Sequence, residues 1–186
     1  KPGRLFQAPA DASFATWEDG PFGRTGDDYY NTISPYDKGP VLGLLLDLKI
    51  RAATKNAKSL DDLMRLLYYR FYKDKGRGFT EAEFRETAEE TAGVSLNDFF
   101  DYIYTLKPVD YAGYLNYAGL AIDTVLHEIP QAWAGLTLTD KKDSLRVSHV
   151  EWESPAWKAG VRTGMMVLAV NGDSMSAHKF NAWLTK

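Results

Sequence analysis

Apolar side chains recur at helical spacing between residues 34 and 119, which predicts a bundle of five helices joined by short loops. The first helix begins at Ser34, a favourable N-cap, and Pro35 fits the first helical position, where no amide partner is needed. From Val41 to Ile50 apolar residues cover most of the helix circumference. A helix of this kind is expected to pack on several sides.

Capping residues set the bounds of the other four helices. Three pairs of residues have capping-box spacing, and glycines stand where helices are expected to stop. The pairs are Ser59 with Asp62, Thr80 with Glu83 and Ser95 with Asp98, the stops are Gly76 and Gly93, and the last short helix is expected from Pro108 to Gly119. Residues 34–119 show no strand pattern, so this part is predicted to be all-α.

Residues 1–33 contain frequent proline and glycine, which predicts an irregular segment that wraps the helical core, with at most a short strand or helical turn near residues 12–17. Tyr29 and Tyr30 leave two interpretations open. They line a substrate cleft, or they pack with their hydroxyl groups in solvent, which is the commoner arrangement beside a buried helix. The expected anchors of the segment are Leu5, Phe6, Phe14 and Trp17.

From residue 120 the pattern changes to alternating and β-branched runs. GLTLTD, SLRVSHVEW and MMVLAVNG are typical of strands, and Asn171-Gly172 is a turn signal. The sequence therefore predicts three parts: the wrapping segment 1–33, the helical part 34–119 and a β-containing domain 120–186. The fold class is multidomain α and β.

Three stretches resemble the glycyl aminopeptidase family of gluzincin zinc metallopeptidases. They are SPYDKGPVLGLLLDLKIR at 34–51, GRGFTEAEF at 76–84 and SLNDFFDYI at 95–103. The resemblance implies that residues 34–119 are the C-terminal half of a thermolysin-like catalytic domain, whose zinc ligands lie upstream of Lys1. It also implies a parent zinc metallo-aminopeptidase that releases small N-terminal residues, such as glycine or alanine, from a peptide substrate by metal-activated water.

Tyr36, in the Tyr-Asp-Lys-Gly stretch, is the one catalytic residue that this resemblance assigns. In the gluzincin aminopeptidases a tyrosine at this place donates a hydrogen bond to the oxygen of the tetrahedral intermediate. A phenol hydroxyl is suited to that role, and a preorganised donor to an oxyanion is worth about 2.7 to 4 kcal/mol. From spacing alone, a core tyrosine in the first turn of a buried helix is the competing interpretation.

The β-containing part resembles a bacterial PDZ domain through SPAWKAGVRTGMMVLAVNG at 154–172, although Met165 replaces the usual acidic residue. The resemblance implies a groove between a strand and the helix 177–184, in a domain without its closing strands. A peptide or protein chain would add along that strand. The expected groove residues are Ala134, Gly135, Leu136, Thr137 and Leu138. A peptide-binding module on a helical scaffold is the alternative function.

Composition argues against two further classes, nucleic-acid-binding and transmembrane proteins. The formal net charge of −3 and the pI near 5.6, without a basic run, argue against nucleic acid as a partner. Apolar runs are too short for a transmembrane helix, and the absence of cysteine leaves the compartment open.

Metal ligands do not gather in this sequence. The histidines His127, His149 and His178 lie 22 and 29 residues apart, and none forms a ligand pair on one helix. His127-Glu128 looks like the start of HExxH, but Gln131 stands at the second histidine position. We therefore expect no cofactor in this part, and no activity without the HExxH region of the parent enzyme.

Overall fold

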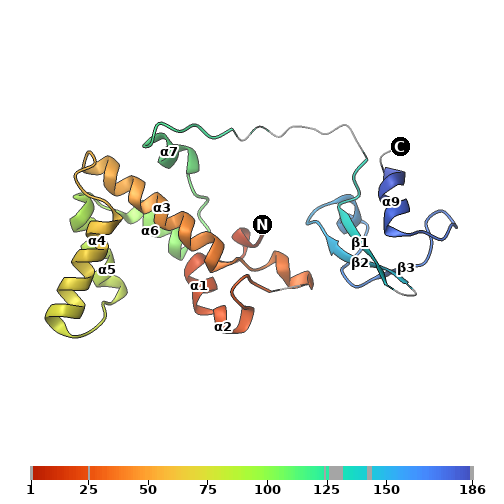
Figure 1. Cartoon of the computed structure of the whole chain (residues 1–186), viewed down its shortest axis with the longest axis horizontal. Coiled ribbons are helices and arrows are strands. Elements are labelled where there is room, and N and C mark those ends of the chain that lie inside the picture. The colour runs from red at the N-terminus through yellow and green to blue at the C-terminus, as the bar shows by residue number, and fades with distance from the viewer. Residues whose placement is uncertain (1, 25, 124, 126–131, 142–143, 185–186) are drawn as a thin grey trace. The chain divides into compact units, whose positions relative to one another are not determined.

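The computed structural model describes residues 2–24, 26–123, 125, 132–141 and 144–184 (Figure 1). The chain forms two compact units, which are described separately. The helical unit comprises Gly3–Gly23 and Asn31–Thr124, and the sheet unit comprises Lys1–Pro2, Arg24–Tyr30 and Val125–Lys186. A helical part followed by a small β part is the architecture that the sequence predicts.

The helical unit is built on α3, the helix expected from Ser34. Ser34 is its N-cap, since its Oγ accepts a hydrogen bond from the backbone N–H of Asp37 at 3.1 Å. The elements are η1 (Pro2–Leu5), α1 (Pro9–Phe14), α2 (Thr16–Asp19), α3 (Pro35–Ala53), α4 (Leu60–Leu67), the π-helical η3 (Tyr68–Lys73), α5 (Glu81–Ala92), α6 (Asn97–Tyr104) and α7 (Tyr111–Asn116).

Local capping chemistry explains where α4 and α5 begin. The backbone N–H of Ser59 donates to Asp62 Oδ2 at 2.8 Å, and the backbone N–H of Thr80 donates to Glu83 Oε2 at 2.9 Å. Both capping boxes are therefore confirmed. Gly93 ends α5 with φ of 68°, a left-handed conformation that glycine adopts without strain.

The other two helix starts differ from the prediction. Helix α6 begins at Asn97, one residue later than a Ser95 cap implies. Ser95 Oγ does accept the backbone N–H of Asn97 at 3.3 Å, but Glu89 of α5, instead of Asp98, is the carboxylate near the helix start, and it accepts the backbone N–H of Leu96 at 2.9 Å. Helix α7 begins at Tyr111 instead of Pro108. Asp110 is its cap and accepts the backbone N–H of Gly113 at 2.9 Å.

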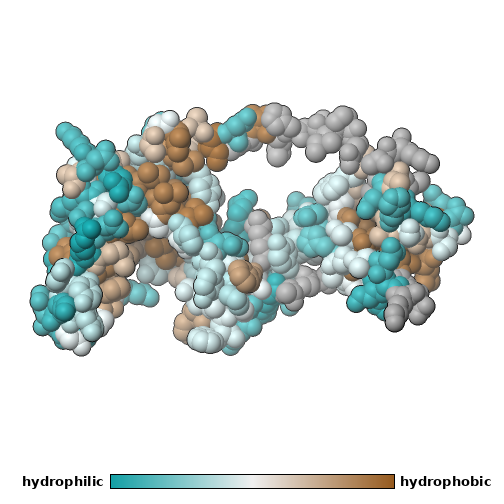
Figure 2. All heavy atoms as spheres, viewed as in Figure 1, coloured by the Kyte–Doolittle hydropathy of each residue, from teal (hydrophilic) through white to brown (hydrophobic). Residues whose placement is uncertain are grey.

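The core of the helical unit is formed by one face of α3 and the helices packed against it. Leu45 and Ile50 of α3 and Leu63 of α4 are at most 1% exposed. The expectation that α3 is covered on several sides holds only in part, since Leu44 is 52% exposed. Figure 2 shows hydrophobic residues (brown) at the surface over α3 in this view.

The N-terminal segment is more regular than predicted, and the expected anchors are wrong. Phe14 and Trp17 are 92% and 97% exposed, and Leu5 and Phe6 are also exposed. Ala8 and Ala12 are buried instead, together with Ile33 at the end of the segment. At Gly3 a large anchor is excluded, because the residue lies so close to the carbonyl of Thr32 that no Cβ would fit.

The sheet unit has one antiparallel sheet in the order β1-β2-β3. Its core joins Leu138 of β1 and Val147 of β2 to Ala156 and Phe180 of two helices. The elements are η2 (Gly26–Tyr30), β1 (Leu136–Lys141), β2 (Ser144–Val150), α8 (Pro155–Lys158), β3 (Met166–Val167) and α9 (Ala177–Leu184).

Tyr30 packs in the sheet unit although it stands in the N-terminal sequence. It is 2% exposed, its ring lies 5.4 Å from that of Trp157, and its hydroxyl is 3.2 Å from His149 Nε2. The packing interpretation of Tyr30 is confirmed, but its hydroxyl contacts a histidine instead of solvent. No helix in the described part of the chain is both long and apolar enough to cross a membrane.

Candidate functional site

Tyr36 lies at the second residue of α3, and its side chain is 63% exposed. The interpretation of Tyr36 as a core tyrosine is therefore wrong. The turn before it is fixed from both sides, because buried Ser34 caps the helix and donates its hydroxyl to the carbonyl of Pro21 at 2.9 Å. The spacing of Ser34 and Asp37 predicts the cap, but no local pattern indicates Pro21 as the second partner of Ser34.

The surroundings of the Tyr36 side chain are open and aromatic. The ring of Phe22, itself exposed, lies 6.4 Å from the ring of Tyr36 at an interplanar angle of 47°. The first turn of an α-helix carries a positive potential, which favours negative charge nearby. A phenol hydroxyl at this place has the chemistry to donate a hydrogen bond to an oxyanion, and its catalytic role remains a prediction.

The predicted groove residues fall at the start of the edge strand β1. Strand β1 pairs with β2, and no other described strand pairs with it. Leu138 is buried in the core and Thr137 is exposed, so alternate side chains face opposite sides, as in a half-buried strand.

Two of the five groove residues precede the strand and use their carbonyls internally. The Ala134 carbonyl accepts the backbone N–H of Ala156 at 3.0 Å, and the Gly135 carbonyl accepts the backbone N–H of Glu151 at 2.7 Å. Gly135 has φ of 69° and lies against Ser154, where a side chain would not fit. The Thr137 carbonyl is also used, since it accepts the Ser148 hydroxyl of β2 at 3.1 Å. In an antiparallel pair alternate residues turn their backbone groups to the partner strand, so Leu136 and Leu138 are the residues of this edge that could receive another chain.

Helix α9 lies beside β1, as the PDZ resemblance implies. The backbone N–H of Ala177 donates to Asp140 Oδ1 at 3.1 Å, and Phe180 is buried in the same core as Leu138. A cavity of about 250 Å³ in this unit is lined by Asp140 and by residues of β3, and includes none of the five predicted groove residues.

The described residues contain no set of side chains that could bind a metal ion. Among them no group of three or more His, Cys, Asp or Glu side chains could hold a metal ion. His149 Nε2 lies 3.1 Å from Glu151 Oε1 and 3.2 Å from the Tyr30 hydroxyl, and His127 lies outside the described residues. The donor chemistry of the described part therefore does not fit a catalytic zinc.

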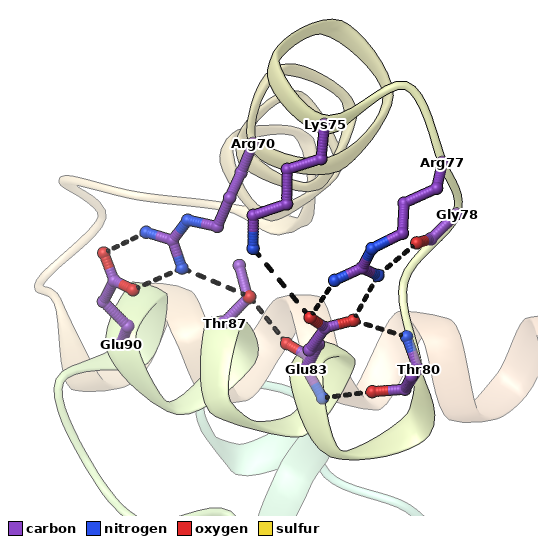
Figure 3. Close-up of polar contacts among 8 residues, drawn as sticks. All are labelled: Arg70, Lys75, Arg77, Gly78, Thr80, Glu83, Thr87 and Glu90. Carbon is purple, nitrogen blue, oxygen red and sulfur yellow. Dashed lines mark hydrogen bonds and ion pairs between the residues drawn. The ribbon is translucent and has the colours of Figure 1, made fainter.

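Two arginines outside α5 pair with glutamates of that helix (Figure 3). The sequence predicts the cap contact of Glu83 with Thr80 but not these pairs. Arg77 donates to both oxygens of Glu83, at 2.6 and 2.8 Å, and Arg70 donates to Glu90 at 2.9 Å. The Arg77 hydrogen bonds, with the backbone N–H of Thr80, lower the pKa of Glu83 to about 2. These contacts fasten the loop before α5 to the helix, which is a structural role.

Comparisons with known protein families and with curated proteins find no match for this chain. A comparison with solved structures matches the crystal structure of an aminopeptidase N family protein from Idiomarina loihiensis, with a TM-score of 0.76 and 21% sequence identity. The match covers 99% of this chain and 33% of that protein. The chain therefore has an aminopeptidase-like fold and spans about a third of the length of that neighbour.

Proposed function

We propose that this chain is part of a zinc-dependent aminopeptidase of the glycyl aminopeptidase type, in which its helical unit is the C-terminal half of a thermolysin-like, gluzincin catalytic domain. The fold match with an aminopeptidase N family protein supports the peptidase class. The Tyr-Asp-Lys-Gly stretch and the other two resembling stretches support the narrower assignment and a preference for small N-terminal residues.

In this proposal Tyr36 is the residue that this chain contributes to catalysis. Its hydroxyl donates a hydrogen bond to the oxygen that becomes negative when the scissile carbonyl turns tetrahedral. The observation that carries the proposal is the exposed position of Tyr36 in the first turn of α3, on a chain segment fixed by Ser34. A donor held in place before reaction loses little free energy to reorganisation in the transition state.

Zinc would be held by residues outside this sequence, because the described residues offer no ligand set. Bound zinc would activate the attacking water. The 186-residue chain is then expected to contain no stoichiometric zinc after dialysis without chelator and to release no amino acid. One tightly bound zinc per chain, together with turnover, would contradict this expectation.

The experiment on the proposed function is a substrate series with the longer protein, including the upstream sequence that the resemblance implies. Glycyl, alanyl and leucyl p-nitroanilides would be compared at equal concentration. We expect release from the glycyl and alanyl substrates to exceed release from the leucyl substrate by at least tenfold. Equal rates would contradict the glycyl type, and no release from any substrate would contradict the aminopeptidase proposal.

A second candidate function is the capture of a peptide by strand addition. The edge position of β1, with α9 beside it, is the observation that favours it. Replacing Leu136 by proline removes one outward-facing backbone donor from the strand. If the sheet unit binds extended peptides through this edge, Leu136→Pro should weaken binding while α3 and its neighbours remain folded.

A further inference from the structure

A cavity of about 340 Å³ lies within the helical unit, and nothing in the proposed function uses it. Its walls come from η1 and the start of α1, from the residues around the start of α3, and from the chain between the end of α6 and the start of α7. Apolar walls are supplied by Ile33 and Val109, together with the ring of Tyr102, which is buried. The volume is at the small end of the range of about 300 to 1,000 Å³ that is usual for ligand sites.

The charges around this cavity have one sign. Arg4, Lys38 and Lys107 line it, and none of its lining residues is an aspartate or a glutamate. Lys107 is already paired, with its Nζ 3.0 Å from Asp101 Oδ2. Arg4 and Lys38 form no ion pair with any described residue. Two positive charges therefore border a partly apolar hollow without a counter-charge.

Lys38 is held in position by Tyr111, which also lines the cavity. Its Nζ donates to the Tyr111 hydroxyl at 2.7 Å and lies 5.2 Å from the centre of the same ring. An ammonium group has three donors, so a hydrogen bond to Tyr111 leaves two for a ligand. A cation fixed before the ligand arrives loses less side-chain entropy on binding than a free lysine.

This cavity is distinct from the surroundings of Tyr36. Successive residues of an α-helix are rotated by about 100°, so Tyr36 and Lys38 point in directions about 200° apart around α3. Phe22, which contacts Tyr36, does not line the cavity. A ligand bound beside Lys38 therefore lies on the side of the helix away from the Tyr36 hydroxyl.

We infer that this cavity is a binding site for a small organic anion, in which an apolar body lies between Ile33, Val109 and Tyr102 and an oxyanion group is bound by Arg4 and Lys38. The oxyanion is a carboxylate or a phosphate monoester, since both accept hydrogen bonds from guanidinium and ammonium donors. The inference does not depend on the aminopeptidase proposal, because it needs neither zinc nor turnover.

Isothermal titration of the 186-residue chain tests it with three probes of similar size. Phenylacetate and phenyl phosphate carry the two oxyanions, and phenylacetamide is a neutral analogue of the first. We expect at least one anion to bind saturably, and at least tenfold more tightly than the amide. The anion that binds more tightly shows whether the site prefers a carboxylate or a phosphate monoester. Its binding should weaken as the salt concentration is raised.

The chain offers a matched control for the key lysine. Lys49, on the same helix, also donates to a tyrosine hydroxyl, that of Tyr117 at 3.2 Å, and lies 5.5 Å from its ring, but it does not line the cavity. Lys38→Met should weaken the binding of the tighter anion at least tenfold, whereas Lys49→Met should change its dissociation constant less than twofold. Circular dichroism of both variants shows that α3 remains folded.

Three results would overturn the inference. They are no saturable binding of either anion by the wild-type chain, equal binding of phenylacetate and phenylacetamide without binding of phenyl phosphate, and equal losses in Lys38→Met and Lys49→Met. If Lys38→Met fails to fold, Arg4→Gln replaces it, because Arg4 lies in the short η1 turn and makes no ion pair with the described residues.

Discussion

The helical unit and the sheet unit are stabilised by different features. In the helical unit, the core joins side chains from α3 to α7, and the starts of α4 and α5 are closed by capping boxes. In the sheet unit, a small core lies under a sheet whose β3 has only two residues and whose β1 lies at an edge. The helical unit is thus expected to be the more stable of the two.

The difference also concerns where chemistry can take place. The helical unit holds Tyr36 and the cationic cavity on segments fixed by caps and hydrogen bonds to neighbouring chain. The sheet unit offers backbone groups along β1, which suit the binding of another chain but not a reaction. A rigid scaffold favours catalysis, and an open edge favours recognition.

The largest effect should come from separate core deletions in the two units. Leu63→Ala removes a fully buried side chain of the helical unit and should lower its unfolding free energy by about 2 to 5 kcal/mol. Val147→Ala removes less volume from the core of the sheet unit. It should lower the unfolding free energy of that unit by roughly 2 kcal/mol, at about 0.8 kcal/mol per buried CH₂. Hydrogen exchange followed by mass spectrometry should show faster exchange only in the unit that carries the substitution.

Each of the two substitutions contains its own control, because exchange in the unit that is not substituted should stay unchanged. If Leu63→Ala accelerated exchange throughout both units, they would unfold as one cooperative body. The comparison between a stable and a less stable unit would then be wrong.

The second effect concerns alkaline pH and Tyr114 of α7. Burial, with Tyr102 nearby, raises the pKa of Tyr114 from 10 to about 12. The folded state holds the neutral phenol while the unfolded chain ionises, so the stability from this group is present below pH 10 and is lost between about pH 10 and 12. The loss is about 2 to 3 kcal/mol. Tyr114→Phe should remove this dependence, measured as the difference in urea unfolding between pH 9 and pH 11.5.

The third effect is the difference in native exchange between the units. Amides from 144 to 184 should exchange at least tenfold faster than those of residues 34–119, because edge and two-residue strands open easily. The measurement uses the wild-type chain at low concentration, so that no second chain can protect β1. Equally slow exchange would mean that another segment of the chain closes the sheet, and the comparison between the units would then be wrong.

The smallest effect is expected from the exposed cluster around Glu83. The pKa of this carboxyl is lowered from 4.5 to about 2, so its contribution is present above pH 4.5 and is lost as the pH falls toward 2. Glu83→Gln should lower the stability of the helical unit at pH 7 and flatten its dependence between pH 4.5 and 2. Glu86→Gln, on an exposed position of the same helix, is the control and should do neither.

Local signals were sufficient for much of the helical unit. The caps at Ser34, Ser59 and Thr80 act within three residues, so the sequence predicts them directly. The start of α6 could not be predicted in this way, because Glu89 reaches across from another helix to bond Leu96. The competing bond is tertiary, and capping-box spacing does not reveal it.

Contacts between distant segments explain what the sequence could not give for the site. Tyr30 meets His149 across 119 positions, and Lys38 meets Tyr111 across 73. No sequence spacing predicts either contact. The exposure of Tyr36 could not be read from helical periodicity either, since a tyrosine in the first turn of an apolar helix fits a core as well as a surface.

The central claim is that the Tyr36 hydroxyl acts in the transition state of peptide hydrolysis, and kinetics of Tyr36→Phe in the longer protein test it directly. Tyr69→Phe is the control, because Tyr69 is similarly exposed, on η3 of the same unit. We predict that Tyr36→Phe lowers kcat and kcat/KM together by about 100-fold with KM little changed, while Tyr69→Phe changes neither more than twofold. An unchanged kcat, or a loss confined to KM, in a folded Tyr36→Phe variant would contradict the claim.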